Sequence, residues 1–231
     1  MNADEVAGTG APRQEIARAV LSAAQAMYAK GLVEGTAGNV SGRVGDGTFC
    51  LTPSSLGYES MREGDLVLVD AAGDVVAGDG HPSSEKALHL ACYRQWAEVG
   101  GVVHCHPVYA SMFAVARQAI PAAIEEVVIY IGGDVEVCDY HLTGSDELGE
   151  AVAAALGERS AVLMANHGLV TVGRHPADAL HAALVVERTA HIVWGARLLG
   201  EPGSVPGKVN EDFAGVYRWV RESTWAGGKR S

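Results

Sequence analysis

The sequence predicts an α/β protein, α+β-like in arrangement, in which helices flank a central, largely antiparallel sheet. The chain has 231 residues, 48% of them hydrophobic, which is enough for one sizeable core. Short β-branched segments come in hairpin-like pairs, as is typical of antiparallel strands. No repeat, low-complexity tract or linker divides the chain. We therefore expect a single domain over residues 1–231, with its core at about 14–199 and a C-terminal tail at 200–231.

The first half of the chain is expected to begin with a helix and to continue as short strands. Apolar residues at helical spacing, ended by Gly31, predict a helix over Gln14–Lys30. A serine at 83 or 84 should cap a second helix that runs to about Ala97. The strands expected between these helices are Asn39–Arg43, Thr48–Leu51, Leu66–Asp70 and Val75–Ala77.

The second half alternates strands and helices. Val102–His106 predicts a strand, and Pro107 suits the first turn of a helix that ends near Arg117. Two strands should flank Gly132-Gly133. The remaining expected elements are strands at Ile124–Tyr130, Val135–Asp139, Ala161–Ala165 and Leu169–Val172, and helices at Asp146–Leu156 and Pro176–Leu199.

Charge and composition exclude several classes of partner. With 28 acidic and 17 basic side chains the net charge is −11, which argues against nucleic acid as a partner. The polar N-terminus does not resemble a signal peptide, and no apolar run is long enough to span a membrane. Four widely spaced cysteines fit reduced thiols. These features predict a cytoplasmic protein without a membrane partner, and any anionic substrate needs a locally positive site.

The segment Val102–His106 carries the sharpest chemical signal. Side chains alternate between the faces of a strand, so His104 and His106 project to one side and Cys105 to the other. Two imidazoles at this spacing can bind a metal ion. They can equally be two partly buried histidines with ordinary hydrogen bonds.

Other polar motifs are ambiguous when each is taken alone. His167, just before Gly168 at a strand end, can line a pocket or simply occupy a turn. Ser83, Ser84 and Glu85 stand at a helix start, where they can bind an anion or merely cap the helix. The segment 34–41, which contains Thr36, Gly38 and Asn39, can form a nest of N–H donors for a phosphate, and Thr52–Ser55 is a similar loop.

Together, the motifs GTAGNVS, TPSS, PSSE, HCH and NHG, in this order and spacing, resemble the class II aldolase/adducin family. Within it, the chain is most similar to the L-fuculose-1-phosphate aldolase type, over about Gln14–Leu199. The resemblance implies a single α/β domain with an antiparallel sheet. It also implies a fourfold-symmetric homotetramer with sites at subunit interfaces, and a divalent metal, usually zinc.

The family's metal site is carried over residue by residue. His104, His106 and His167 match the three metal-binding histidines, and Glu85 matches the carboxylate that closes the site at rest and serves as the base during turnover. Three nitrogens and one oxygen suit Zn²⁺, while Mn²⁺, Fe²⁺ and Co²⁺ are compatible with the same ligands.

The family's phosphate-binding positions contain no lysine or arginine in this chain. Ser55 also stands in this region, where fuculose-type enzymes commonly have glycine. Hydroxyls, amides and a helix start would therefore hold the phosphate, at Thr36, Gly38, Asn39, Ser54, Ser83 and Ser84.

A departure from the family pattern concerns the second proton-transfer group. Fuculose-type enzymes place a tyrosine before the Gly-Gly pair, and it contributes to a neighbouring subunit's site. Here Glu126 falls on that position, and Tyr130 is displaced by four residues. Glu126 is either this group or an exposed acid at a strand start. Tyr217, from the tail of an adjacent subunit, is a further candidate.

The resemblance implies a class II aldehyde-lyase. The metal would act as a Lewis acid while a ketose 1-phosphate, L-fuculose 1-phosphate-like or a deoxypentulose 1-phosphate, is cleaved to dihydroxyacetone phosphate and an aldehyde via an enediolate. One alternative is a methylthioribulose-1-phosphate-type dehydratase that uses Glu126. Another is a ribulose-phosphate 4-epimerase, although those enzymes typically carry aspartate at the position of Glu85. A non-enzymatic, adducin-like module is disfavoured because the three histidines and Glu85 are all present.

Overall fold

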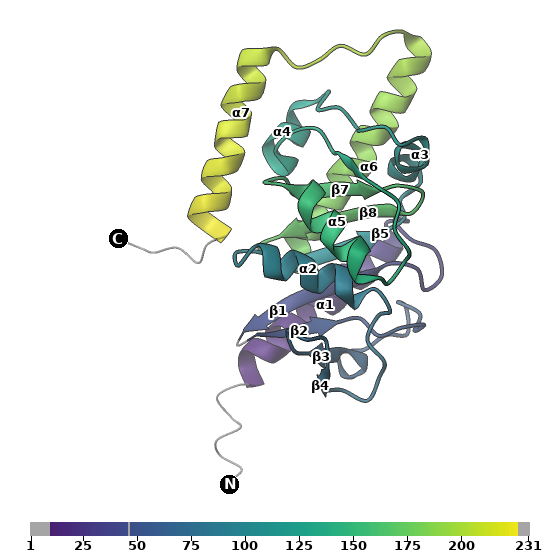
Figure 1. The fold of residues 1–231 in the computed structure, drawn as a ribbon, viewed down its shortest axis with the longest axis vertical. Coiled ribbons are helices and arrows are strands. Elements are labelled where there is room, and N and C mark those ends of the chain that lie inside the picture. The colour runs from purple at the N-terminus through teal and green to yellow at the C-terminus, as the bar shows by residue number, and fades with distance from the viewer. Residues whose placement is uncertain (1–9, 46, 226–231) are drawn as a thin grey trace.

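A central sheet of eight strands organises the part of the chain that the computed structural model describes, residues 10–45 and 47–225 (Figure 1). The strand order is β4-β3-β2-β1-β5-β8-β7-β6, and every neighbouring pair is antiparallel except β6 and β7. The strands are β1 (Asn39–Gly45), β2 (Thr48–Leu51), β3 (Val67–Val69), β4 (Val75–Ala77), β5 (Gly101–Cys105), β6 (Val137–Cys138), β7 (Ala161–Met164) and β8 (Gly168–Gly173). The predicted fold class is confirmed.

Helices cover both faces of this sheet. They are α1 (Gly10–Ala29), α2 (Lys86–Gln95), α3 (Val108–Ala116), α4 (Glu125–Ile131), α5 (Asp146–Leu156), α6 (Pro176–Leu199) and α7 (Gly207–Val220). A short 3-10 turn, Glu63–Asp65, precedes β3, and a π-helical turn, Arg221–Trp225, follows α7. Helices α2 and α5 pack together on one face, whereas α1, α3, α4 and α6 contribute to the core on the other.

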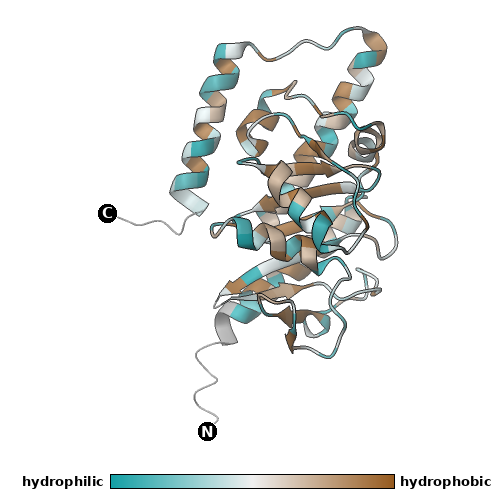
Figure 2. Cartoon of the chain, viewed as in Figure 1, coloured by the Kyte–Doolittle hydropathy of each residue, from teal (hydrophilic) through white to brown (hydrophobic). Residues whose placement is uncertain are grey.

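Alternation along the strands divides the core into two clusters. In β5, Val103 and Cys105 join the cluster beneath α1 and α6, while Val102 joins the cluster beneath α2 and α5. Each fully buried side chain of this size contributes about 1.5–3 kcal/mol through the hydrophobic effect. Most strands are therefore rich in hydrophobic residues that enter one or other cluster, and Figure 2 colours much of the sheet brown. His104 shares the face of Val102, where a polar side chain needs a partner.

One predicted strand is wrong. The predicted strand 124–130 is instead helix α4 (Glu125–Ile131). Glu125 and Glu126 occupy its first turn, where the helix dipole favours acidic groups, and Gly132 ends it in a left-handed conformation. The β-branched residues between them had suggested a strand. The next predicted strand, 135–139, shrinks to β6. The predicted serine cap of α2 is also displaced, because Glu85 is the N-cap and its N–H donates to Ser83 Oγ.

The described part of the C-terminal tail, residues 200–225, is largely helical. Residues 200–206 carry the chain from α6 to α7, which lies along the edge of the molecule and packs on α4 (Figure 1). The rest of the predicted tail, residues 226–231, lies outside the described residues. None of the helices in the described ranges is both long and apolar enough to cross a membrane.

Candidate metal centre

Three histidines from two neighbouring strands meet at one end of the sheet. His104 lies in β5, His106 follows β5, and His167 precedes β8. The two strands are antiparallel neighbours in which Cys105 pairs with Leu169, so the end of β5 lies beside the start of β8. One nitrogen from each of the three rings lies within 4.8 Å of the others.

Local backbone features hold the rings at this distance. A Cβ at position 168 would lie 2.6 Å from the carbonyl oxygen of Cys105 and 2.7 Å from His106 Cδ2, so only glycine fits there. After His106 the chain enters α3, whose first free N–H groups, those of Tyr109 and Ala110, donate to the carboxylate of Glu187. The close approach of Gly168 and the anchored start of α3 together fix the position of His106.

Glu85 brings a carboxylate to the histidines from the start of α2. Its Oε2 lies 3.2 Å from His104 Nε2, and its Oε1 lies 3.3 Å from His167 Nε2. Burial alone would raise the pKa of Glu85. The hydrogen bond and charge of His104, the charge of His167 and the amide of Asn39 outweigh burial and lower this pKa below its usual range. Glu85 is therefore a carboxylate at neutral pH.

Burial keeps two of the imidazoles neutral. It is the main cause that lowers the pKa of His106 and of His167 to about 4, with repulsion between the rings adding to it. A neutral imidazole has one nitrogen lone pair free for a metal ion. The Nδ1–H of His104 donates to the carbonyl oxygen of Leu169 at 3.0 Å, which directs Nε2 into the site.

The arrangement fits a divalent metal ion. His104 Nε2 lies near Glu85 Oε2 and also 2.9 Å from His106 Nε2. A single proton on His104 Nε2 cannot serve both neighbours, whereas a cation between them can. The donor set of three imidazole nitrogens and one carboxylate oxygen is one that Zn²⁺ accepts.

Three loops that contain the predicted phosphate-binding residues surround this site. Asn39 pairs with His104 across β1 and β5, which places the 36–39 loop beside the histidines. The 52–55 and 81–84 segments are joined by a bridge between Pro53 and Pro82, and by the hydrogen bond from the N–H of Ser54 to the carbonyl of His81 at 2.8 Å.

The hydroxyl groups in these loops differ in exposure. Thr36, Ser54, Ser55 and Ser84 are exposed, and Ser83 is buried with its hydroxyl occupied by the N–H of Glu85. Ser55 has a left-handed backbone, with φ of 62°. Glycine adopts this conformation without strain, so the glycine that the family resemblance leads one to expect here would fit the same backbone.

Asn39 differs from the other predicted phosphate residues. Its side chain is 4% exposed, its Nδ2 donates to Glu85 Oε2 at 2.9 Å, and its Oδ1 accepts from His89 Nε2. Both polar atoms of its side chain are thus held by protein groups. Sequence reasoning missed His89, although its position one helical turn after Glu85 placed it on the same face of α2.

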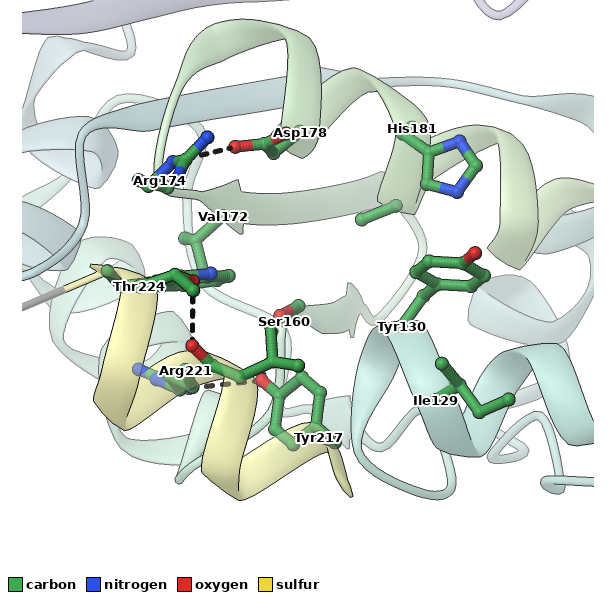
Figure 3. A pocket seen from close by; sticks show the side chains of 13 residues that line it. Ile129, Tyr130, Ser160, Val172, Arg174, Asp178, His181, Tyr217, Arg221 and Thr224 are labelled. Carbon is green, nitrogen blue, oxygen red and sulfur yellow. Dashed lines mark hydrogen bonds and ion pairs between the residues drawn. The ribbon is translucent and has the colours of Figure 1, made fainter. Parts of the chain in front are cut away.

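The structure does not bring Glu126 or Tyr217 to the histidines within one chain. Glu126 is exposed in the first turn of α4. Tyr217 is buried, and its hydroxyl lies 2.8 Å from both Ser160 Oγ and the carbonyl oxygen of Glu158. It lines a different cavity of about 260 Å³, where Figure 3 shows it beside Ser160 and Arg221, opposite Tyr130 and His181.

A wider groove opens beside the histidines. His106 lines a space of about 850 Å³ between the 31–37 loop and helix α3. From α3, Val108, Met112 and Val115 face this groove and are 56%, 42% and 61% exposed. Such an exposed apolar stripe beside a polar centre is typical of a surface that binds a ligand or another subunit.

Comparisons with known proteins agree with one another. The family profile described as Class II Aldolase and Adducin N-terminal domain matches residues 18–194. A 5-methylthioribulose-1-phosphate/5-deoxyribulose-1-phosphate aldolase from Rhodospirillum rubrum is 35% identical over 187 residues, which cover 81% of this chain and 84% of that protein. A 5-deoxy-D-ribulose 1-phosphate aldolase from Bacillus thuringiensis is 32% identical over 189 residues, covering 81% and 88%.

Solved structures show the same fold. An L-fuculose 1-phosphate aldolase superposes with a TM-score of 0.84 at 30% identity, over 88% of this chain and 96% of that one. An L-fuculose-1-phosphate aldolase from Thermus thermophilus superposes with a TM-score of 0.72 at 26% identity, covering 83% and 98%.

Proposed function

This chain belongs to the class II aldolase/adducin family, and on that premise we propose that it cleaves a ketose 1-phosphate, of the deoxypentulose class, to dihydroxyacetone phosphate and an aldehyde. The observation that carries the proposal is the joint placement of three histidines and the Glu85 carboxylate beside an open groove. The two aldolases that are 35% and 32% identical to it act, by their names, on 5-deoxyribulose or 5-methylthioribulose 1-phosphate.

His104, His106 and His167 would hold a divalent metal ion, with Glu85 as the fourth ligand at rest, and their donor set favours Zn²⁺ over Mn²⁺, Fe²⁺ or Co²⁺. When bound, such an ion polarises the substrate's carbonyl oxygen and stabilises the negative charge that develops there. The exposed hydroxyls of Thr36, Ser54, Ser55 and Ser84, the backbone at Gly38 and the helix start near Ser83 would bind the phosphate.

Glu85 would move the proton at the reacting carbon. In the direction of synthesis, its carboxylate removes a proton from the hydroxymethyl carbon of dihydroxyacetone phosphate, and the electron pair moves to the carbonyl oxygen, which leaves an enediolate. The enediolate carbon then attacks the aldehyde. Cleavage runs through the same steps in reverse, so Glu85 returns the proton to carbon.

A second group must exchange a proton with the aldehyde oxygen. We assign this role to Glu126 from a neighbouring copy, because it is exposed and lies away from the histidines of its own chain. Tyr217 is less suited because its hydroxyl is buried against Ser160 and Glu158. The exposed stripe of Val108, Met112 and Val115 supports a subunit interface beside the groove, and we infer a homotetramer with sites at subunit boundaries.

The test is incubation of zinc-loaded protein with 5-deoxyribulose, 5-methylthioribulose and L-fuculose 1-phosphates. Dihydroxyacetone phosphate is followed by an NADH-linked reductase. We expect product from at least one of the first two, and a fall in kcat of about 10²- to 10⁴-fold in Glu85→Gln. Glu150→Gln, an exposed change on α5, is the matched control. Loss of water without dihydroxyacetone phosphate would contradict the aldolase and indicate a dehydratase.

A further inference from the structure

A buried row of polar side chains joins helix α2 to strand β1 directly behind Glu85. Glu85, His89 and Tyr93 lie at intervals of four residues on one face of α2, and Asn39 and Ser41 lie on one face of β1. All five residues are at most 6% exposed. We call these five residues the α2–β1 ladder.

Hydrogen bonds connect the members of the ladder in sequence. Asn39 Nδ2 lies 2.9 Å from Glu85 Oε2, and Asn39 Oδ1 contacts His89 Nε2. On the other side of the ring, His89 Nδ1 lies 2.6 Å from Ser41 Oγ, which lies 2.8 Å from the hydroxyl of Tyr93. Each polar atom in the row except Glu85 Oε1 thus has a hydrogen-bond partner in the protein, and the row ends at the carboxylate.

The carboxylate determines the direction of every bond in the ladder. Glu85 can only accept, so Asn39 must present its amide N–H to Glu85 and its carbonyl oxygen to His89. His89 must then carry its proton on Nε2 and accept at Nδ1. Ser41 must therefore donate to His89, and Tyr93 must donate to Ser41. All the donors point toward Glu85.

Burial maintains this arrangement. His89 has no exposed surface, and burial lowers its pKa to about 3, so the ring is neutral and keeps one donor and one acceptor. In contrast, Glu85 Oε1 has no hydrogen-bond partner among residues 10–45 and 47–225 and only faces His167 Nε2 at 3.3 Å. One carboxylate oxygen is therefore held by the ladder, while the other points toward the histidines.

We propose that the α2–β1 ladder is a positioning device for Glu85, in which His89 holds the Asn39 amide in the orientation that fixes the carboxylate. This inference rests on the proposed role of Glu85 as the base. Without His89, the Asn39 amide can rotate and place its oxygen against the carboxylate, which repels it. A fixed carboxylate needs no reorganisation when the proton is transferred, and this benefits the transition state more than substrate binding.

The test compares two substitutions at His89. His89→Leu removes both hydrogen bonds at similar volume, and we expect kcat to fall about 10- to 100-fold with KM nearly unchanged. His89→Gln keeps a donor for Asn39 and an acceptor for Ser41, and it should restore most of kcat. Both variants should bind as much zinc as the wild type. Leu90→Ala, a core change on the same helix, controls for lost stability and should leave kcat unchanged.

A milder variant keeps the test decisive if His89→Leu does not fold. Ser41→Ala removes the donor to His89 Nδ1 and should lower kcat several-fold, again with KM unchanged. Normal kcat in folded His89→Leu, or in Ser41→Ala where His89→Leu is unfolded, would overturn the inference. A fall no larger than that of equally destabilised Leu90→Ala would do the same.

A readout without metal or substrate checks the same geometry. In ¹⁵N-labelled, metal-free protein, NMR should show His89 as the neutral Nε2–H tautomer, and an Nδ1–H tautomer or an imidazolium at neutral pH would overturn the inference.

Failure of the proposed function would look different: the wild type would release no dihydroxyacetone phosphate, or Glu85→Gln would be fully active. An active wild type with an inactive Glu85→Gln but an active His89→Leu rejects the ladder alone.

Discussion

The histidine site and the C-terminal arm, residues 200–225, are built in different ways. The histidine site, comprising His104, His106, His167 and Glu85, draws on adjacent strands and a helix start, so the register of the sheet fixes its geometry. The arm lies at the edge of the molecule, and α7 packs mainly on α4 (Figure 1).

Two buried polar side chains, Tyr217 and Arg221, attach the end of the arm. Arg221 pairs with Glu98 at 3.2 Å and lies 5.7 and 5.0 Å from the ring centres of Trp96 and Trp225. Its guanidinium and the Tyr217 hydroxyl both donate to the carbonyl oxygen of Glu158. One chain thus assembles the metal ligands and the base, whereas the arm has only an anchoring arrangement in the same chain.

The largest effect should come from His106→Ala. Removal of one ligand weakens metal binding and with it several kcal/mol of transition-state stabilisation, so kcat/KM should fall by about 10³-fold or more. Activity and bound metal are measured together, with His141→Ala as a control outside the site. Full activity at full metal content in His106→Ala would contradict the assignment of the ligand.

The next largest effect tests whether Glu126 acts in the site of a neighbouring copy of the chain. Glu126→Gln should lower kcat by about 10²-fold or more, as expected for a proton-transfer group. If Glu126 acts in a neighbour's site, then co-refolding equal amounts of Glu126→Gln and His106→Ala restores sites that have both intact groups. Random assembly of a cyclic tetramer predicts about a quarter of wild-type activity. Mixed assemblies that remain inactive would place Glu126 outside the neighbour's site.

The same contrast shows why the sequence predicted one region better than the other. Alternation in 102–106 correctly placed His104 and His106 on one face and Cys105 on the other, because a buried strand leaves little freedom. The spacing of the motifs could not reveal that Asn39 turns its side chain to Glu85 and His89. That arrangement depends on which helix packs over β1, which is determined by the tertiary structure.

Local sequence patterns were misleading at α4 and in the arm that packs on it. The β-branched run after Glu126 suggested a strand, although the acidic first turn and Gly132 were helix signals that the resulting α4 obeys. Helix α7 was not predicted because its flanks are rich in glycine and proline. Only Tyr217 among the residues of α7 is buried, although the helix is amphipathic, so the segment lacks the broad buried face that marks the core helices.

Acid should lower the folding stability of the metal-free protein through the buried imidazoles of the histidine site and the α2–β1 ladder, and not through the arm. The folded pKa values of His89, His106 and His167 are about 3, 4 and 4, below the ordinary value near 6.5. Between pH 6.5 and pH 4, these three histidines bind protons in the unfolded chain but not in the folded chain. The free energy of unfolding therefore decreases as the pH falls through this range. Each group contributes up to about 1.4 kcal/mol per pH unit.

Urea unfolding of metal-free protein across this pH range measures the slope. His89→Gln should flatten it because one buried imidazole is gone. Tyr217→Phe should keep the wild-type slope, since burial raises the pKa of Tyr217 and its hydroxyl stays neutral throughout. An unchanged slope in His89→Gln would contradict a neutral, buried His89.

Tyr217→Phe should have the smallest effect on catalysis, and it tests most directly whether the arm has only an anchoring role. The substitution removes a buried hydroxyl that joins Ser160, Glu158 and Arg221, so the free energy of unfolding should fall by about 1–3 kcal/mol. Because this hydroxyl faces its own chain, kcat and KM should not change. Ser160→Ala removes a partner of the same hydroxyl, and because the two residues are in contact the double variant should lose less stability than the two single losses combined. A tenfold loss of kcat at unchanged stability would instead make Tyr217 a catalytic group, and the arm would then have to reach a neighbouring site in the assembled protein.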